Sequence, residues 1–62
     1  MPDKAESPRQ RILRTASELF YRQGYAATGI NQIIREAEVA KATFYTNFPS
    51  KGELGTAWLE MR

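Results

Sequence analysis

Residues 39–51 read VAKATFYTNFPSK, and this stretch decides the fold. It contains no acidic residue, although the whole chain has seven. Phe44 and Phe48 are suited to packing in a core, while most of the other side chains are hydroxyls, one amide and two lysines. A segment of this composition is suited to contact with a polyanion rather than to burial.

A turn precedes this stretch and a proline closes it. Val39 follows Glu38 where the apolar pattern of the preceding segment breaks, which predicts a tight turn. A short helix is then expected from about residue 40 or 41 to residue 47. Pro49 ends that helix, because the residue before a proline is disfavoured in the helical region of backbone space.

Another helix is expected to follow directly. Ser50 and Glu53 have the Ser-x-x-Glu spacing of a capping box, in which each side chain accepts a hydrogen bond from the other residue's backbone N–H. The helix that begins here has an apolar face that is unbroken at the last residue, so we expect the natural helix to continue beyond it. This face consists of Leu54, Ala57, Trp58 and Met61.

The segment before the turn predicts a long first helix. Ser7, Pro8 and Gln10 read as an N-cap, a proline at the first helical position and a capping box, so the helix should begin at Pro8. Gly24 should end it in a left-handed conformation, with Tyr25 folding back onto the last turn. The apolar stripe between these signals comprises Ile12, Leu13, Ala16, Leu19 and Phe20.

A second, shorter helix is predicted between this connector and the turn. Either Thr28 or Gly29 caps it. Its apolar residues again repeat at helical spacing, and they are Ile30, Ile33, Ile34 and Ala37. The expected fold is therefore all-α.

Composition excludes several classes of function. The 62-residue chain has no histidine and no cysteine, so the usual side chains of nucleophilic and metal catalysis are missing. We expect neither an enzyme nor a cofactor. No apolar run is long enough to cross a bilayer and the polar N-terminus is not a signal peptide, so we expect a cytoplasmic protein without membrane contact.

The predicted arrangement is a helix-turn-helix, in which two short helices are joined by a tight turn and the second has a polar outer face. The second helix of this motif enters the major groove of DNA. Small residues such as Ala40 and Ala42 let the backbone approach the bases, while Lys41 and Thr43 can reach base edges. We therefore expect Lys41, Ala42 and Thr43 to read the sequence.

Phosphate contacts are expected about one turn further along the same helix. Tyr45, Thr46 and Asn47 lie where a side chain reaches the sugar-phosphate backbone more easily than the bases. Lys51 adds positive charge beside the free N–H groups at the start of the fourth helix. Thr28 has the corresponding place at the start of the second helix, on the opposite wall of the groove.

A set of positions agrees in order and spacing with a known family. The set is Arg11-Ile12-Leu13, Ala16, Leu19-Phe20, Gly24-Tyr25, Thr28, Ile33, Ala37, Val39, Thr43-Phe44-Tyr45, Asn47-Phe48 and Ser50-Lys51. Together these residues resemble the N-terminal domain of TetR-family regulators, over nearly the whole chain from Arg9 to Trp58. The resemblance implies a three-helix, homeodomain-like helix-turn-helix head and the start of a fourth, linking helix. It also implies a larger domain, missing here, that dimerises and binds a small-molecule effector.

The resemblance assigns roles residue by residue that agree with the chemistry of the side chains. The base-reading positions correspond to Lys41, Ala42 and Thr43, the backbone-clamping tyrosine to Tyr45, the phosphate-binding lysine to Lys51, and further contact positions to Thr28, Thr46 and Asn47.

Four positions depart from the family pattern. Glu38 stands in the turn where glycine is frequent, and a left-handed glutamate there costs about 1–2 kcal/mol. Ala42 replaces a frequent glycine, and Ile34 replaces a small alanine that permits close helix packing. Gly29 replaces a frequent threonine or serine, so a side-chain phosphate contact is not expected from it.

We therefore expect a flexible arm at residues 1–7, a helix-turn-helix DNA-binding domain at 8–49, and the start of a fourth helix at 50–62 that leads to the absent domain. The expected function is sequence-specific regulation of transcription by a homodimeric repressor on palindromic operator DNA, relieved by the effector. The alternative is a small helical module that binds an acidic protein partner, or that dimerises through the apolar face of the fourth helix.

Overall fold

The computed structural model describes residues 6–61, and the elements in this range are four helices without a strand. They are α1 (Pro8–Gln23), α2 (Ile30–Ala37), α3 (Lys41–Asn47) and α4 (Lys51–Met61). The expected all-α fold is confirmed. Most of the expected N-terminal arm, residues 1–5, lies outside the described residues. None of the helices between residues 6 and 61 is long and apolar enough to cross a membrane.

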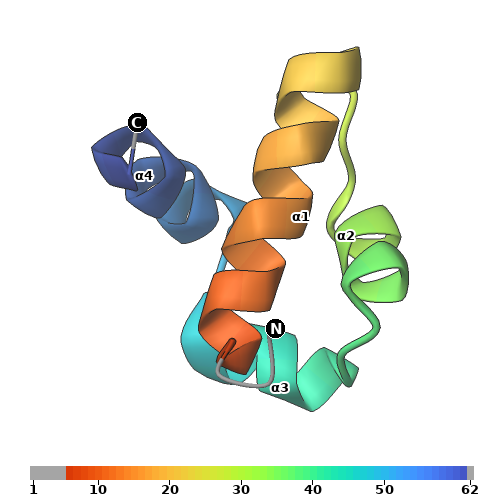
Figure 1. The fold of residues 1–62 in the computed structure, drawn as a ribbon, viewed down its shortest axis with the longest axis vertical. Coiled ribbons are helices and arrows are strands. Elements are labelled where there is room, and N and C mark those ends of the chain that lie inside the picture. The colour runs from red at the N-terminus through yellow and green to blue at the C-terminus, as the bar shows by residue number, and fades with distance from the viewer. Residues whose placement is uncertain (1–5, 62) are drawn as a thin grey trace.

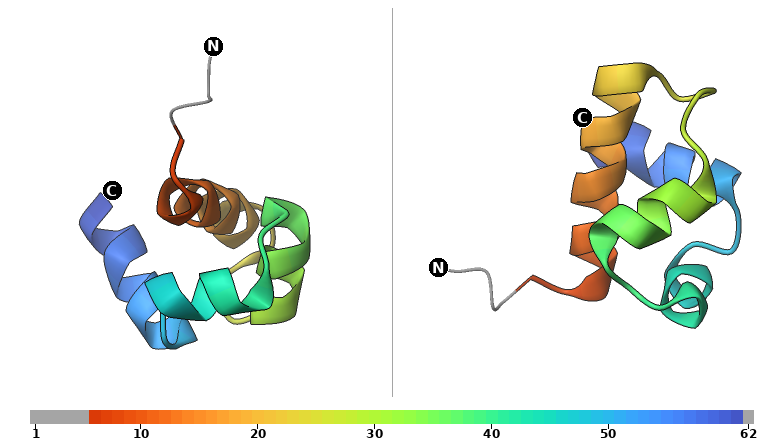
Figure 2. Two further views of the ribbon diagram at one scale, coloured as in Figure 1. Left: turned by 90° about the horizontal axis from the view of Figure 1, so that it is seen from below. Right: turned by 90° about the vertical axis from the view of Figure 1, so that its right-hand side faces the viewer.

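Helix α1 is the centre of the fold and contacts each of the other three helices (Figure 1). Helices α2 and α4 lie on opposite sides of it, and α3 crosses its N-terminal end, as the two views in Figure 2 also show. This arrangement leaves the outer face of α3 at one end of the molecule, with no other helix over it.

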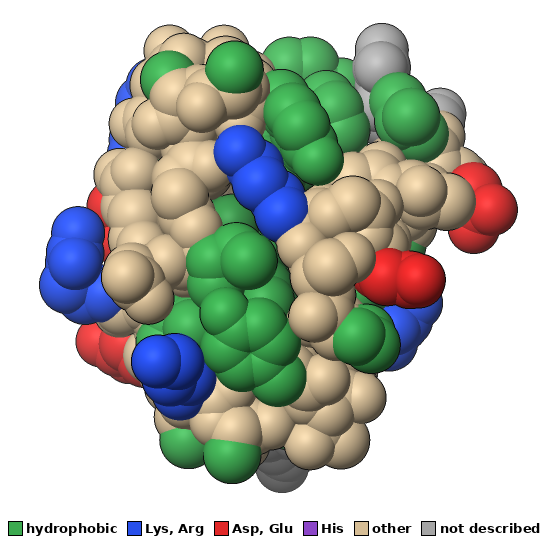
Figure 3. Space-filling view, turned by 180° about the vertical axis from the view of Figure 1, so that it is seen from behind, with side chains coloured by type: hydrophobic (Ala, Val, Ile, Leu, Met, Phe, Trp, Pro, Cys, Tyr) green, Lys and Arg blue, Asp and Glu red, His purple; other side chains and the backbone are tan. Residues whose placement is uncertain are grey.

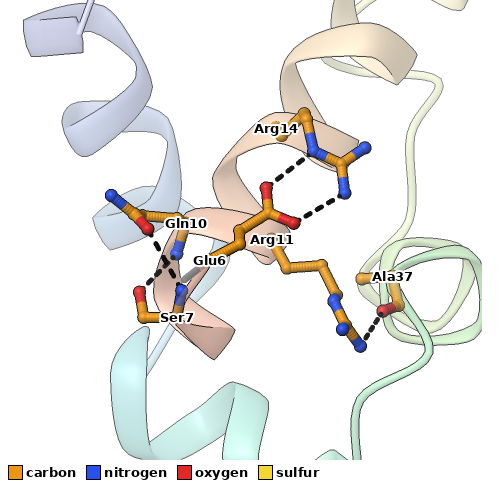
Figure 4. Close-up of polar contacts among 6 residues, drawn as sticks. All are labelled: Glu6, Ser7, Gln10, Arg11, Arg14 and Ala37. Atoms are coloured by element: carbon orange, nitrogen blue, oxygen red, sulfur yellow. Dashed lines mark hydrogen bonds and ion pairs between the residues drawn. The ribbon is translucent and has the colours of Figure 1, made fainter. Parts of the chain in front are cut away.

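Both ends of α1 follow from local signals. The backbone N–H of Gln10 donates to Ser7 Oγ at 3.2 Å and the Ser7 N–H donates to Gln10 Oε1 at 3.1 Å, so the predicted capping box is present (Figure 4). Gly24 has a positive φ of 96°, as expected, but its ψ of 150° is extended rather than helical. The ring of Tyr25 then packs on Phe20 at 5.0 Å between centroids, which confirms the predicted fold-back.

A single cluster of buried apolar side chains joins the helices. The largest contribution from the helix-turn-helix segment is Phe44, which is fully buried, together with Phe48. Thr15 is also buried, although it is not part of the predicted apolar stripe. The cluster consists of Ile12, Ala16, Leu19, Phe20, Ile33, Ala37, Phe44, Phe48 and Leu54.

Helix α4 packs its apolar face onto the rest of the domain. Leu54 is fully buried, and Trp58 is half-buried with its ring edge on Phe20 at 4.8 Å between centroids. The indole N–H of Trp58 donates to Ser17 Oγ at 3.2 Å. Met61, by contrast, is half exposed. Most of the face considered as an alternative dimerisation surface is therefore occupied within the domain itself.

The turn between α2 and α3 is a Schellman motif centred on Glu38. This glutamate has φ 58° and ψ 45°, the left-handed helical conformation. Its N–H donates to the carbonyl of Arg35 and the N–H of Val39 donates to that of Ile34, both at 3.3 Å, which are the two hydrogen bonds of the motif. The predicted tight turn is present, and the half-buried Val39 packs against the core. The turn that aims α3 therefore contains a strained residue.

Replacing Glu38 by glycine is expected to stabilise the domain by about 0.5–1 kcal/mol. The left-handed conformation costs an L-residue about 1–2 kcal/mol, whereas glycine adopts it freely but loses roughly 0.5–1 kcal/mol more backbone entropy on folding. The change also removes a carboxylate from the negative end of the α2 dipole. In a domain of this size, the midpoint of thermal unfolding should rise by about 2–8 °C.

Glu38→Ala is the matched control, because it removes the carboxylate but keeps the left-handed strain. Thermal unfolding followed by circular dichroism should rank Glu38→Gly above Glu38→Ala. Equal midpoints for the two variants would show that the strain at Glu38 does not exceed the extra backbone entropy that glycine loses on folding.

Candidate nucleic-acid interface

Helix α3 has one buried side and one exposed side. Phe44 points into the core, while Lys41, Ala42 and Tyr45 are exposed, with 39% of the tyrosine accessible. Thr43 is half-buried beside them. The three expected reading residues therefore lie consecutively at the start of α3, and the expected clamping tyrosine lies on its outer side.

The two polar residues at the end of α3 are turned back onto their own helix. The Thr46 hydroxyl donates to the Ala42 carbonyl, and Asn47 Nδ2 donates to the Thr43 carbonyl, both at 2.9 Å. Each side chain keeps unused hydrogen-bonding capacity, because a hydroxyl can also accept and an amide has a second N–H and an oxygen. Both are thus available to a ligand at the end of α3.

Lys51 is held against an aromatic ring at the start of α4. Its Nζ lies 4.4 Å from the centroid of the Tyr25 ring, and the Tyr25 hydroxyl donates to the Lys51 carbonyl at 3.4 Å. Cation–π contacts of this kind restrain a lysine that would otherwise be mobile. The lysine therefore has a defined position at the edge of the surface formed by α3.

Gly55 makes room for this tyrosine, and neither residue is among the site residues predicted from the sequence. A Cβ atom at Gly55 would lie 2.9 Å from Tyr25 Cε1, closer than real contacts allow. The available signal was the glycine itself, since a glycine inside a helix often marks close approach of another group.

Thr28 has a different environment from that expected of a phosphate contact. Its side chain is 1% exposed, and its hydroxyl donates to the Gly24 carbonyl at 2.7 Å. It also accepts a hydrogen bond from Gln23 Nε2 at 3.3 Å. The N-cap of α2 is Gly29, which is the second of the two predicted alternatives. Thr28 therefore orders the connector between α1 and α2, and its hydroxyl is not presented on the surface.

The charges around α3 favour an anionic ligand. Residues 39–51 contain two lysines and no carboxylate. Figure 3 shows one face of the molecule on which Lys and Arg side chains lie among uncharged ones, with Asp and Glu toward the sides. The ion pairs within residues 6–61 join α1 to Glu6 and to α2, and neither of them includes a residue of α3. The Arg14 hydrogen bond lowers the pKa of Glu6, which keeps this carboxylate charged.

The fold and this surface define a helix-turn-helix domain of the DNA-binding type. The sequence model of the family described as "Bacterial regulatory proteins, tetR family" matches residues 12–57. The chain belongs to this family, whose members are regulators of transcription rather than enzymes. The expected resemblance is confirmed.

Similar proteins come from several bacteria. The uncharacterized HTH-type transcriptional regulator YxaF of Bacillus subtilis is 51% identical over 45 residues, which cover 73% of this chain and 24% of that protein. The HTH-type transcriptional repressor NemR of Escherichia coli K12 is 36% identical over 52 residues, covering 84% and 26%. The chain spans about a quarter of the length of these relatives. No solved structure matches it.

Proposed function

We propose that the domain binds operator DNA with α3 in the major groove, where Lys41, Ala42 and Thr43 read base edges. One observation carries this proposal: the outer side of α3 is exposed and free of carboxylates, while the inner side is anchored by the buried Phe44. A helix fixed in this way can approach the bases closely, since its leading residues are small.

The surrounding polar groups serve as phosphate contacts in this proposal. Tyr45, Thr46 and Asn47 meet the DNA backbone along α3, and Lys51 meets it from the start of α4. Such contacts fix the register of a protein on DNA without selecting a sequence. Thr28 contributes indirectly, by holding the connector that leads into α2.

For the intact protein we propose a homodimeric, cytoplasmic repressor that binds a palindromic operator and is released by a small-molecule effector. This proposal is supported by family membership and by the relatives, in which the matching residues make up only about a quarter of the length, so that there is room for a further domain. One of them, NemR, is named a repressor. Two heads on one dimer would occupy half-sites at least one helical turn apart.

Selection of duplexes from a randomised library tests the reading function. The wild-type chain should enrich a short motif. Lys41→Ala and Thr43→Ala should each change the preferred bases at particular positions of that motif, because the loss of a base contact relaxes discrimination at the base pair that was contacted. The bases are identified by sequencing the bound pool.

The control is Tyr45→Ala, which should lower the bound fraction while leaving the enriched motif unchanged, because phosphate contacts carry no sequence information. Identical motifs for the wild type, Lys41→Ala and Thr43→Ala would remove the two residues from base readout. Failure of the wild-type chain to retain any duplex at low salt would overturn the proposed function.

A further inference from the structure

The arginines of α1 have different partners. Arg14 makes a bidentate pair with Glu6 through hydrogen bonds of 2.7 and 3.0 Å, and Arg11 Nη1 donates to the Ala37 carbonyl at 3.5 Å (Figure 4). Arg22 Nη2 lies 3.8 Å from a carboxylate oxygen of α2. These three side chains therefore contact groups within the domain, either in α2 or in the segment before α1.

Arg9 is directed toward α3 instead. Its Nη1 donates to the carbonyl of Asn47, the last residue of α3, at 3.4 Å. Its guanidinium carbon lies 4.5 Å from the centroid of the Phe48 ring. The residue is exposed, and within residues 6–61 it forms no ion pair with a carboxylate. Arg9 is thus an uncompensated cation at the C-terminal end of the helix that faces DNA.

The two contacts restrain the guanidinium but leave most of its hydrogen-bond donors without a partner within residues 6–61. A guanidinium has five N–H donors in one plane, and the hydrogen bond to Asn47 uses one of them. The contact with Phe48 restrains the group, and the remaining donors form a planar fork of the kind that matches phosphate oxygens. Little side-chain entropy remains to be lost when an anion binds.

Arg9 also changes the charge at the end of α3. The last carbonyl groups of a helix carry partial negative charge, which would repel a phosphate. The hydrogen bond from Arg9 to the Asn47 carbonyl offsets this charge at the place where Thr46 and Asn47 are expected to meet the DNA backbone. A phosphate near the end of α3 therefore meets a net cation.

We propose that Arg9 binds a phosphate of the DNA backbone, and that the interface extends from the end of α3 onto the first turn of α1. This inference rests on the proposed function. Lys51 lies against Tyr25, just beyond the C-terminal end of α1, whereas Arg9 is in its first turn. The two cations are held by different groups, and we expect them to contact different phosphates.

The test measures the affinity of the 62-residue chain for a short fluorescein-labelled duplex of mixed sequence at several salt concentrations. Arg9→Gln removes the charge but keeps a planar amide that can lie on Phe48. It should lower the slope of log K against log salt by about one unit and weaken binding roughly tenfold at low salt. Arg9→Lys should keep the slope, because the charge is retained, and lose only a few-fold in affinity.

Two further variants separate the possible results. Lys51→Gln is the positive control and should also lower the slope by about one unit. Arg22→Gln is the matched control at the other end of α1 and should leave the slope unchanged. If Lys51→Gln behaves as expected while Arg9→Gln matches Arg22→Gln, the inference about Arg9 is wrong and the proposed function stands. If the wild-type chain shows no salt-dependent binding, both are wrong.

Discussion

Replacing Phe44 by alanine is expected to unfold the domain. The ring is fully buried, and it lies 5.3 Å from Tyr45 and 6.1 Å from Phe48 between centroids. Truncating a buried phenylalanine to alanine costs about 3–5 kcal/mol. A chain of this length has a total stability of about 3–9 kcal/mol, so the loss takes up much or all of it. Far-ultraviolet circular dichroism during heating should show a much lower midpoint, or little helix at any temperature.

Tyr45 provides the control for this prediction, because it is the next residue on the same helix and faces outward. Tyr45→Ala loses an edge-on ring contact worth about 0.5–1.5 kcal/mol and leaves the core filled. The domain should stay folded while its affinity for DNA falls. A melting curve for Phe44→Ala close to that of Tyr45→Ala would show that α3 is not anchored through Phe44.

The helices and their ends could be predicted because each depends on residues close together in sequence. The capping box of Ser7 and Gln10 and the break at Pro49 act within a few residues, and both agree with the structure. The turn at Glu38 was expected as a departure from the family pattern, and its cost was anticipated. Local chemistry was sufficient for the fold.

The environment of individual polar side chains was harder to predict, because it depends on segments that are distant in sequence. Thr28 is a small polar residue at a helix start, which is typical of an exposed cap, yet the path of the connector from Gly24 brings its hydroxyl into the interior. The packing of Tyr25 against Gly55 and Lys51 joins residues about 30 positions apart, and the glycine inside α4 marks a close approach without showing which residue makes it. Periodicity shows which face of a helix is apolar but not which residue of another helix meets it.

The arginines of α1 illustrate the same limit. Arg9 and Arg11 both lie near the start of the helix, so their positions in the sequence do not show which element each side chain reaches. In the structure Arg11 reaches the end of α2 and Arg9 reaches the end of α3. The two-residue separation turns the side chains by about 200° around the helix axis, so only Arg9 reaches the C-terminal end of α3.

Replacing Ala42 by glutamate is expected to abolish DNA binding without weakening the fold. Ala42 is exposed in the first turn of α3, where a carboxylate is favoured by the helix dipole, so unfolding should be unchanged or slightly harder. In the proposed complex the same carboxylate would face the bases and phosphates of the groove at close range. Like charges brought together in this way cost several kcal/mol, which corresponds to a loss of affinity of at least about 100-fold.

Leu59→Glu separates this local effect from a general change in charge. Both substitutions lower the net charge of the chain from +2 to +1, but Leu59 is 60% exposed on the last turn of α4, away from α3 (Figure 1). Its effect on binding should be limited to a weak long-range electrostatic repulsion between the added carboxylate and the DNA, which salt screens. Titration of a labelled duplex at low salt should therefore place Leu59→Glu within a few-fold of the wild type and Ala42→Glu far below both. Equal losses for the two variants would mean that α3 does not enter the groove, and that the affinity comes from net charge alone.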